Sequence, residues 1–354
     1  MAKKTAILTK RQDYILALLE KNGELGISEI ISGLKPMFKA VSKITVNRDL
    51  KRLLESGYAA ARGKARATVY ELSGYYNLIR PVEVEKYFKI ETDKRTGKQS
   101  FDLGVFNLLN NILTRAEAEY LNVLNNEYKK NIKKIPKNSR QQEFLRLIIE
   151  LSWKSSQIEG NTYSLLETEA LLKNQRRAKG HKPAEATMIL NHKDTLDYIL
   201  KNKNNFKTVS VAKLEDIHYL LTKNLGIARN LRKSAVGIVG TKYKPLDNQY
   251  QIREAVEKTC GLVNREANPF AKAILLSLLI AYIQPFADGN KRTSRLIANA
   301  VLLAYDICPL SYRNVDEVEY KKAVILFYEQ NNLSYYKRLF IEQFEFAVKN
   351  YFRA

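Results

Sequence analysis

Two strongly apolar segments, residues 269–283 and 291–305, flank a short polar loop and constrain the fold more than any other feature. Both carry apolar side chains at three- and four-residue spacing, which predicts a helix in each case. The first is apolar on almost every side, so we expect it at the centre of a domain. Its longest apolar run, residues 273–283, is too short to cross a bilayer. The pair therefore predicts the core of a helical domain.

Helical spacing also dominates the rest of the chain from residue 114 onward. It predicts further helices over residues 115–131, 140–158, 165–174, 184–201, 211–225, 251–266, 316–329 and 334–350. One segment differs, because residues 235–245 alternate in the manner of a short β-hairpin that turns at Gly240. For residues 114–354 we therefore expect an all-helical domain with one hairpin.

Residues 1–75 predict a separate, smaller domain of mixed α and β structure. Apolar spacing indicates helices over residues 11–21 and 28–34, and a third that follows the N-cap Ser42. The apolar stripe expected on the third helix is Ile44, Val46, Leu50, Leu53 and Leu54. Residues 58–72 then read as two short strands around a basic turn. Three helices and a basic hairpin resemble a winged helix-turn-helix domain of the bacterial repressor type.

In that type of domain the third helix enters the major groove of DNA and the wing contacts the backbone. The resemblance implies that short polar side chains would read base edges while Lys and Arg hold phosphates. The residues expected at DNA are Lys43, Thr45, Asn47, Arg48, Arg52, Arg62, Lys64 and Arg66. The alternative is a winged helix that serves protein contact or dimerisation.

The formal net charge of +22 fits nucleic acid as a partner, and it fits a lysine-rich, solvated surface equally well. Two cysteines cannot build a disulfide framework, and the sequence does not open with the apolar core of a signal peptide. We therefore expect a cytoplasmic protein with no membrane segment. Residues 76–113 form a mixed connector, in which residues 82–90 alternate weakly like an edge strand.

The polar loop between the two apolar helices predicts a site for a polyphosphate and its metal. Gly289 and Asn290 tolerate left-handed dihedrals, so successive N–H groups can turn to one side at the start of a helix. Arg292 and Arg295 are three residues apart and share a helix face near that end. Asp288 supplies a carboxylate for Mg²⁺, and the apolar residue at position 286 would anchor the loop in the core.

The residues from Pro285 to Arg295 resemble the motif of Fic-domain proteins, His-Pro-Phe-x-Asp/Glu-Gly-Asn-Gly/Lys-Arg-x-x-Arg. Every defined position is met except the first, where Gln284 replaces histidine. The resemblance implies transfer of AMP from ATP to a hydroxyl of a target protein, with Mg²⁺ held by Asp288. It also implies nucleotide contacts by Phe286, Gly289, Asn290, Lys291, Arg292 and Arg295, with Gln284, Arg292 and Arg295 at catalytic positions.

Two other segments are similar to parts of the same family. Ser155, Glu159 and Gly160 match its autoinhibitory motif, Ser/Thr-x-x-x-Glu-Gly/Asn, in which the glutamate pairs with the second motif arginine. The alternative is that Glu159 is a capping or surface carboxylate with no inhibitory role. The segment around Gly240 resembles the family's flap, which aligns the target by strand addition. The flap residues so implied are Val236, Ile238, Gly240 and Tyr243.

Gln284 leaves three interpretations open, because a glutamine amide has no useful basicity. The enzyme could be natural but weak or altered, or the domain could bind a nucleotide without transferring it and act as a nucleotide-sensing transcription regulator. The third is an engineered inactivation. His218 is expected to be a packed or cap-bonding histidine rather than a substitute base. The target, which could be the chain itself, and a possible homodimer are not specified by the sequence.

Overall fold

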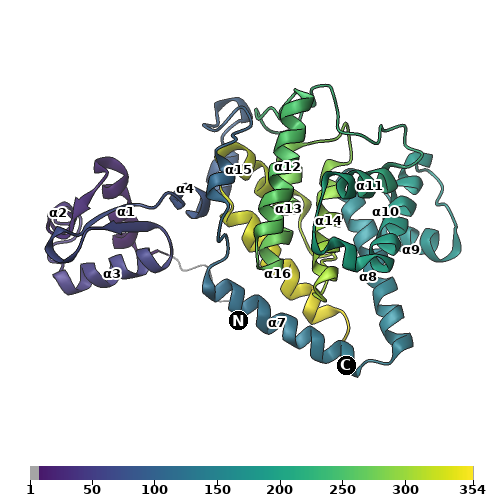
Figure 1. Cartoon of the computed structure of the whole chain (residues 1–354), viewed down its shortest axis with the longest axis horizontal. Helices are drawn as coiled ribbons and strands as arrows, with labels where there is room; N and C mark the ends of the chain where they lie inside the picture. Colours follow the sequence, from purple (N-terminus) through teal and green to yellow (C-terminus); the bar gives the residue numbers. More distant parts are fainter. Residues whose placement is uncertain (1–7, 354) are drawn as a thin grey trace. The chain divides into compact units, whose positions relative to one another are not determined.

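The computed structural model describes residues 8–353 and shows a mainly helical protein (Figure 1). The chain forms two compact units, and the boundary lies between Pro81 and Val82. Residues 82–113 of the expected connector belong to the second unit. Among the helices of residues 8–353, none has the length and apolar character that a membrane crossing needs.

The first unit combines three main helices with a small antiparallel sheet. Its elements are α1 (Lys10–Asn22), β1 (Leu25–Gly26), α2 (Ile27–Leu34), α3 (Lys43–Glu55), β2 (Ala59–Arg62), η1 (Ala65–Ala67), β3 (Val69–Leu72) and α4 (Tyr76–Ile79). Strand β3 lies between β1 and β2 and pairs antiparallel with both. Ser42 caps α3, because its Oγ accepts a hydrogen bond from the N–H of Thr45 at 3.2 Å.

Helix α3 buries positions 46, 49, 50 and 53, which follow the three- and four-residue spacing of one helix face. Asp49 is buried on this face, where its carboxylate accepts from Arg11 at 2.5 Å and from Gln12 at 3.2 Å. The predicted stripe was wrong at Ile44 and Leu54, which are 72% and 37% exposed. Both positions lie off the row that contacts α1 and α2.

The second unit contains the remaining elements, and most of them match the expected helices. They are α5 (Val84–Lys89), η2 (Thr92–Lys94), α6 (Val105–Leu108), α7 (Arg115–Lys134), α8 (Lys137–Gln157), α9 (Leu165–Asn174), α10 (Pro183–Lys201), η3 (Lys203–Lys207), α11 (Val211–Thr222), α12 (Gln249–Arg265), α13 (Pro269–Ile283), α14 (Asn290–Ala304), α15 (Glu317–Gln330) and α16 (Ser334–Asn350). The mainly helical fold class is confirmed.

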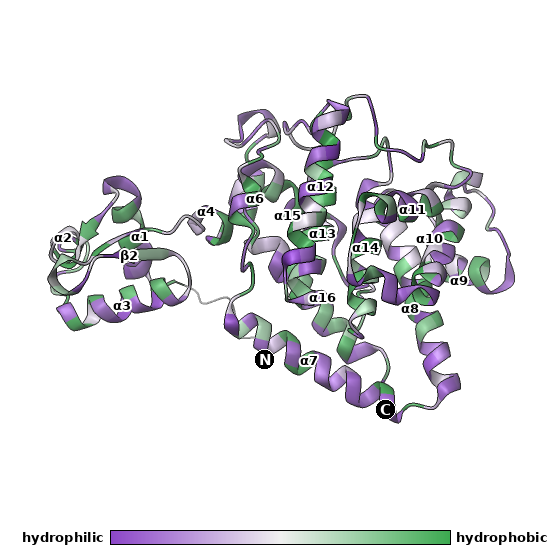
Figure 2. Ribbon diagram, in the orientation of Figure 1, coloured by the Kyte–Doolittle hydropathy of each residue, from purple (hydrophilic) through white to green (hydrophobic). Residues whose placement is uncertain are grey.

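Helix α13 lies at the centre of the second unit, as its composition predicts. Every residue from Phe270 to Ile283 is buried, and α14 packs along it. Outer helices are amphipathic instead. Helix α7 alternates between hydrophilic and hydrophobic colours along its length in Figure 2, and it buries Leu121, Leu124 and Tyr128 on one side. The two central helices thus form a rigid support for the loop that joins them.

Two strand predictions were wrong. Residues 235–245 contain no paired strands, and residues 84–89 form the short helix α5. In residues 235–245 the backbone groups bond to distant parts of the unit instead of to each other. The carbonyl of Gly240 accepts from Arg95 at 2.5 Å, and the N–H of Lys244 donates to Gln99 at 2.9 Å. Tertiary contacts therefore override the local alternation of the sequence. We call residues 235–245 the flap.

Candidate functional site

The loop between α13 and α14 is closed by a reciprocal pair of hydrogen bonds. The N–H of Phe286 donates to Asn290 Oδ1, and Asn290 Nδ2 donates to the carbonyl of Phe286, both at 2.8 Å. Phe286 is fully buried and stacks on the imidazole of His218, with ring centroids 3.8 Å apart. The aromatic residue therefore anchors the loop, as the sequence predicts.

Gly289 occupies a position that other residues would fill poorly. Its φ of 79° is in the left-handed region, and a Cβ there would lie 3.2 Å from Thr222 Cγ2 and 3.5 Å from Arg292 Nη2. Helix α14 begins at the next residue, Asn290. The start of α14 thus presents its N–H groups beside a backbone with no side chain, which is the arrangement that binds anions.

Arg292 projects from the first turn of α14 and is only 2% exposed. Burial lowers the pKa of its guanidinium. Its Nη2 lies 3.7 Å from the Asp288 carboxylate, while its Nη1 has no hydrogen-bond partner among the described residues. A buried donor without a partner costs free energy, and an anionic ligand would remove that cost. This unpaired donor fits a phosphate oxygen.

Arg295, one turn further along α14, is fully buried and held by the end of α8. Its Nε donates to Ser155 Oγ at 2.9 Å, and its Nη2 donates to Ser155 O at 2.8 Å and to Glu159 Oε1 at 2.9 Å. Burial acts to lower the pKa of Arg295, but Tyr320 and Glu159 raise it overall. The guanidinium lies over the Tyr320 ring, 5.3 Å from its centroid.

Glu159 contacts two cations of the loop region. Its Oε1 binds Arg295, and its Oε2 lies 3.6 Å from the ammonium of Lys291. Burial acts to raise the pKa of Glu159, yet the charges of Arg295 and Lys291 hold it below its ordinary value. Gly160 follows with a φ of 95° and turns the chain away from the site. The structure therefore brings the predicted inhibitory carboxylate to the predicted phosphate site.

Asp288 is the one carboxylate of the loop itself. Its side chain is 70% exposed, and its Oδ1 accepts from the N–H of Gly289 at 2.6 Å. Among residues 8–353 no cluster of three or more His, Cys, Asp or Glu side chains could hold a metal alone. A single exposed carboxylate beside a phosphate site still fits Mg²⁺, which commonly binds through one or two carboxylates and the phosphates of its substrate.

Gln284 caps α13 in a left-handed conformation, with a φ of 51°, and is 8% exposed. The side-chain nitrogen of Gln284 donates to the carbonyl of Ala281 at 2.6 Å. The backbone carbonyl of Gln284 accepts from Arg232 Nε, also at 2.6 Å. The side chain at this position is therefore a neutral amide beside Tyr328. It can orient a hydroxyl or a water, but it cannot take up a proton at neutral pH.

Three residues outside the motif support the loop. His218 is packed as expected, and its Nε2 hydrogen-bonds the carbonyl of Asp288 at 2.9 Å, while burial lowers its pKa. Arg232 also donates its N–H to the carbonyl of Pro285 at 2.9 Å. Tyr328 Oη donates to the carbonyl of Ala281 at 2.6 Å. The contacts of Arg232 with the loop and of Tyr328 with the end of α13 were missed, since no local pattern in the sequence marks a contact across so many residues.

The predicted flap residues are not equivalent in the structure. Val236 and Ile238 are half-buried and Gly240 is exposed, whereas Tyr243 is buried with its Oη donating to the carbonyl of Tyr282 at 2.8 Å. Val239, between them, is 98% exposed. The exposed part of the flap is therefore its first half.

The residues expected to contact DNA belong to the first unit, and their side chains differ in exposure and in hydrogen bonding. Lys43, Asn47, Arg48, Arg52 and Lys64 are exposed. Thr45 is half-buried, and its hydroxyl lies 3.0 Å from that of Ser42. Arg62 is engaged with Glu24 and Glu71, both at 2.5 Å. The side chain of Arg66 lies outside the described part of the chain.

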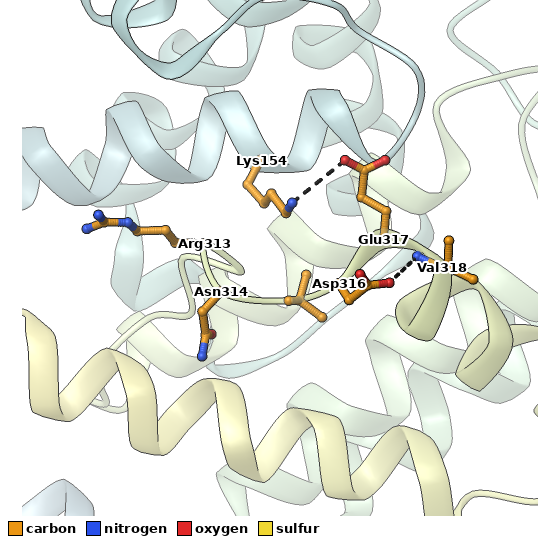
Figure 3. Close-up of a pocket in the computed structure, with 7 residues that line it drawn as sticks. Lys154, Arg313, Asn314, Asp316, Glu317 and Val318 are labelled. Carbon is orange, nitrogen blue, oxygen red and sulfur yellow. Dashed lines mark hydrogen bonds and ion pairs between the residues drawn. The ribbon is translucent and has the colours of Figure 1, made fainter. Parts of the chain in front are cut away.

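A polar cavity of about 460 Å³ lies beside the C-terminal part of α8 (Figure 3). Lys154, which directly precedes Ser155, points into it and lies 3.7 Å from Glu317. Asp316 caps α15 from the same wall by accepting from the N–H of Val318. None of the residues that line the cavity is a predicted site residue, so the cavity is distinct from the loop.

Comparison with known proteins matches this arrangement to one family. The model of the Fic/DOC family matches residues 208–302. A Fido domain-containing protein of Dictyostelium discoideum is 31% identical over 111 residues, which cover 28% of this chain and 78% of that protein. A protein adenylyltransferase Fic of Nematostella vectensis is 27% identical over 176 residues, or 48% of this chain. The chain belongs to the Fic/DOC family.

A solved structure shows the same fold at low identity. Fic-1 (residues 134–508) of C. elegans superposes with a TM-score of 0.56 and 18% identity, covering 66% of this chain and 71% of that one. The chain spans 30% to 40% of the lengths of the Nematostella, Culex and Aedes adenylyltransferases that it matches. The similarity thus concerns the domain around the loop rather than those whole proteins.

Proposed function

We propose that the second unit binds ATP and transfers AMP to a hydroxyl of a target protein or of the chain itself. The observation that carries the proposal is the unpaired, buried Nη1 of Arg292 at the start of α14. Such a donor is suited to a phosphate oxygen. The relatives named protein adenylyltransferase support both the nucleotide and the reaction.

In this reaction the hydroxyl oxygen attacks the α-phosphorus, the bond to the β-phosphate oxygen breaks, and pyrophosphate leaves. Arg292, Arg295 and the N–H groups of α14 would bind the phosphates and neutralise their charge. Mg²⁺, held by Asp288 and the phosphates, would supply further charge neutralisation. No side-chain base stands at position 284, so the hydroxyl proton passes to solvent water.

The missing base predicts a weak transferase. Loss of a general base typically costs about 10²–10⁴-fold in rate. Phosphoryl-type transfer can proceed through a loose transition state in which positioning dominates, so residual activity is compatible with Gln284. A nucleotide-sensing regulator without transfer is the second candidate, because the phosphate-binding residues remain complete while the base is absent.

Glu159 would restrain either activity. It occupies the Nη2 donor of Arg295 that a γ-phosphate would need, and it adds negative charge beside Lys291. Removing this carboxylate should therefore strengthen ATP binding. The expected gain is about 1.5–3 kcal/mol, the typical range for a charged hydrogen bond.

The test uses the full chain with labelled ATP and Mg²⁺. Four proteins are compared: wild type, Glu159→Gly, Gln284→His and the double variant. Glu169→Gly serves as a matched control, since Glu169 is an exposed carboxylate whose partner is Lys173 on the same helix. ATP affinity is measured by calorimetry, and transfer is measured by label retained on protein.

We expect Glu159→Gly to bind ATP more tightly than wild type and the double variant to label most strongly. Labelling of the double variant alone would identify the native chain as a nucleotide binder without transfer activity. If neither Glu159→Gly nor the double variant binds ATP, the nucleotide proposal is wrong. The control should behave as wild type in both assays.

We further propose that the first unit binds DNA through α3. The outward residues Lys43, Asn47 and Arg48 combine an amide that can read a base edge with cations for phosphates. Affinity for a duplex should fall steeply with salt, and Arg48→Ala should reduce the slope by about one unit. Lys35→Ala, outside α3, is the control. Absence of binding to mixed duplexes at low salt would refute this proposal.

A further inference from the structure

The flap is held by a segment at the beginning of the second unit, residues 87–102, which we call the strap. The N–H of Lys244 donates to the carbonyl of Gln99, and Ser100 pairs with Lys244 in parallel orientation. The ammonium of Lys242 donates to the carbonyl of Asp93 at 2.8 Å. The second half of the flap therefore has a neighbouring chain segment along its edge, while the first half has none of these bonds.

A buried carboxylate joins strap and flap. Glu329, near the end of α15, accepts from Tyr87 Oη at 2.6 Å, from Arg95 Nη2 at 3.0 Å and from Thr241 Oγ1 at 2.6 Å. The side chains of Arg95 and Glu329 are 5% and 4% exposed. The same nitrogen of Arg95 donates to the flap carbonyl of Gly240. One ion pair thus connects the strap, α15 and the turn of the flap.

The backbone of the strap approaches α15 very closely at Gly97. A Cβ at this position would lie 2.9 Å from both the Cβ and the carbonyl oxygen of Glu329. The next N–H, of Lys98, donates to that carbonyl at 2.6 Å. Any side chain at position 97 would push the strap away from Glu329, so the glycine fixes the distance between them.

The other end of the strap contacts the helix that leads into the phosphate loop. Phe101 stacks on Tyr282 with ring centroids 4.6 Å apart, and the N–H of Asp102 donates to Tyr282 Oη at 3.0 Å. Tyr243 of the flap also stacks on the Tyr282 ring, with ring centroids 4.8 Å apart. Tyr282 lies two residues before Gln284. Strap and flap therefore pack on one ring of α13, two residues before the loop.

We propose that the strap holds the flap in position beside the end of α13 that leads into the phosphate loop, with Arg95 and Glu329 as its positioning residues. The inference rests on the proposed function, in which the flap receives the target segment. Because the strap already covers residues 240–244, an extended target would add to residues 235–239, where Val239 is exposed. The acceptor suited to that edge is an extended segment with apolar side chains.

The test measures hydrogen exchange of flap amides by mass spectrometry in the full chain. Arg95→Met keeps apolar volume over the Tyr87 and Phe88 rings but removes the donor to Gly240. Loss of a charged hydrogen bond should speed exchange of the amides of residues 240–244 by about 10- to 100-fold. Glu85→Gln is the matched control, since Glu85 pairs with Lys322 of α15 without touching the flap.

Further variants separate positioning from general damage. Arg95→Lys keeps the charge and should restore most of the protection. Thr241→Val removes one bond to Glu329 at nearly constant volume and should speed flap exchange by a smaller factor. ATP affinity should stay within about twofold of wild type in all of them, because no strap residue contacts the loop arginines.

Flap exchange in Arg95→Met that equals wild type, or that rises no more than exchange throughout the unit, would overturn the inference. Flap exchange that rises while α13 and the loop stay protected supports it. Failure of both Glu159→Gly and the double variant to bind ATP would reject the proposed function and leave the exchange result interpretable, so the two failures are distinguishable.

Discussion

The phosphate loop and the flap lie on the same helical unit, yet they differ in how much of their support is local. The loop closes on itself through the reciprocal bonds of Phe286 and Asn290 and the bond from Gly289 to Asp288, and Arg232 and His218 only add to this closure from outside. The flap has almost no internal bonds and depends on Arg95, Gln99 and Glu329, which are far away in the sequence. A locally closed loop keeps its shape when other elements move, whereas a flap held from outside can be released by them.

The strongest test of local closure is Gly289→Ala. A side chain at a φ of 79° and 3.2 Å from Thr222 Cγ2 adds strain of about 1–3 kcal/mol or more. We expect ATP affinity to fall at least about tenfold, by calorimetry. Hydrogen exchange of residues 235–245 should stay as in wild type, and a change there of similar size would contradict the independence of the two regions. Gly237→Ala, where a Cβ meets nothing within 4 Å, is the control.

A smaller effect is expected for Asn290→Asp. The carboxylate still accepts from the N–H of Phe286 but cannot donate to its carbonyl, which remains buried and unpaired. The free energy of unfolding should fall by about 1–3 kcal/mol, measured by urea titration. Asn350→Asp, at an exposed helix end, should change it little. Equal losses in both variants would show that the reciprocal bond does not close the loop.

Tyr243→Phe tests the external attachment of the flap. The substitution removes the donor to the carbonyl of Tyr282 and keeps the ring stack, so we expect a loss of about 1 kcal/mol. Exchange of residues 240–245 should accelerate while ATP affinity is unchanged. Tyr250→Phe, at an exposed position, is the control. A weaker ATP affinity in Tyr243→Phe would mean that flap and loop are not independent.

The smallest effect is expected from a change of pH, which should act through His192, a buried histidine near the loop arginines. Burial, followed by the charges of Arg295 and Arg292, lowers the pKa of His192 well below its usual value. The unfolded chain therefore binds more protons than the folded chain once the pH falls below about 6.5, and stability declines there. His192→Asn should flatten the decline in urea titrations at pH 7.5 and 5.5. An unchanged decline would assign it to other groups.

The same difference between local and distant contacts explains which features the sequence could predict. The residues of the loop are contiguous, so their spacing alone indicated a buried anchor, a glycine turn and two arginines on one face. The helices were predictable because their apolar periodicity is local. The contacts between the flap and the strap were not predictable, since the bond from Arg95 to Gly240 spans 145 positions and leaves no local pattern. Ile44 was misplaced for a different reason, because it lies off the row of α3 that is buried, while the polar Asp49 lies on that row.

The contacts of Ser155 with Arg295 bear on how fast the proposed restraint by Glu159 can be released. The Oγ and the carbonyl of Ser155 bind Nε and Nη2 of Arg295 independently of the Glu159 carboxylate, so we expect the guanidinium to stay aligned when the carboxylate leaves. Release of Arg295 from the carboxylate would then require only rotation of the Glu159 side chain. The neighbouring Gly160 has open space around it and would not obstruct that rotation. Side-chain rotations are far faster than the microsecond-to-millisecond rearrangement of whole elements. We therefore expect activation by loss of this contact to show no slow phase before nucleotide binding.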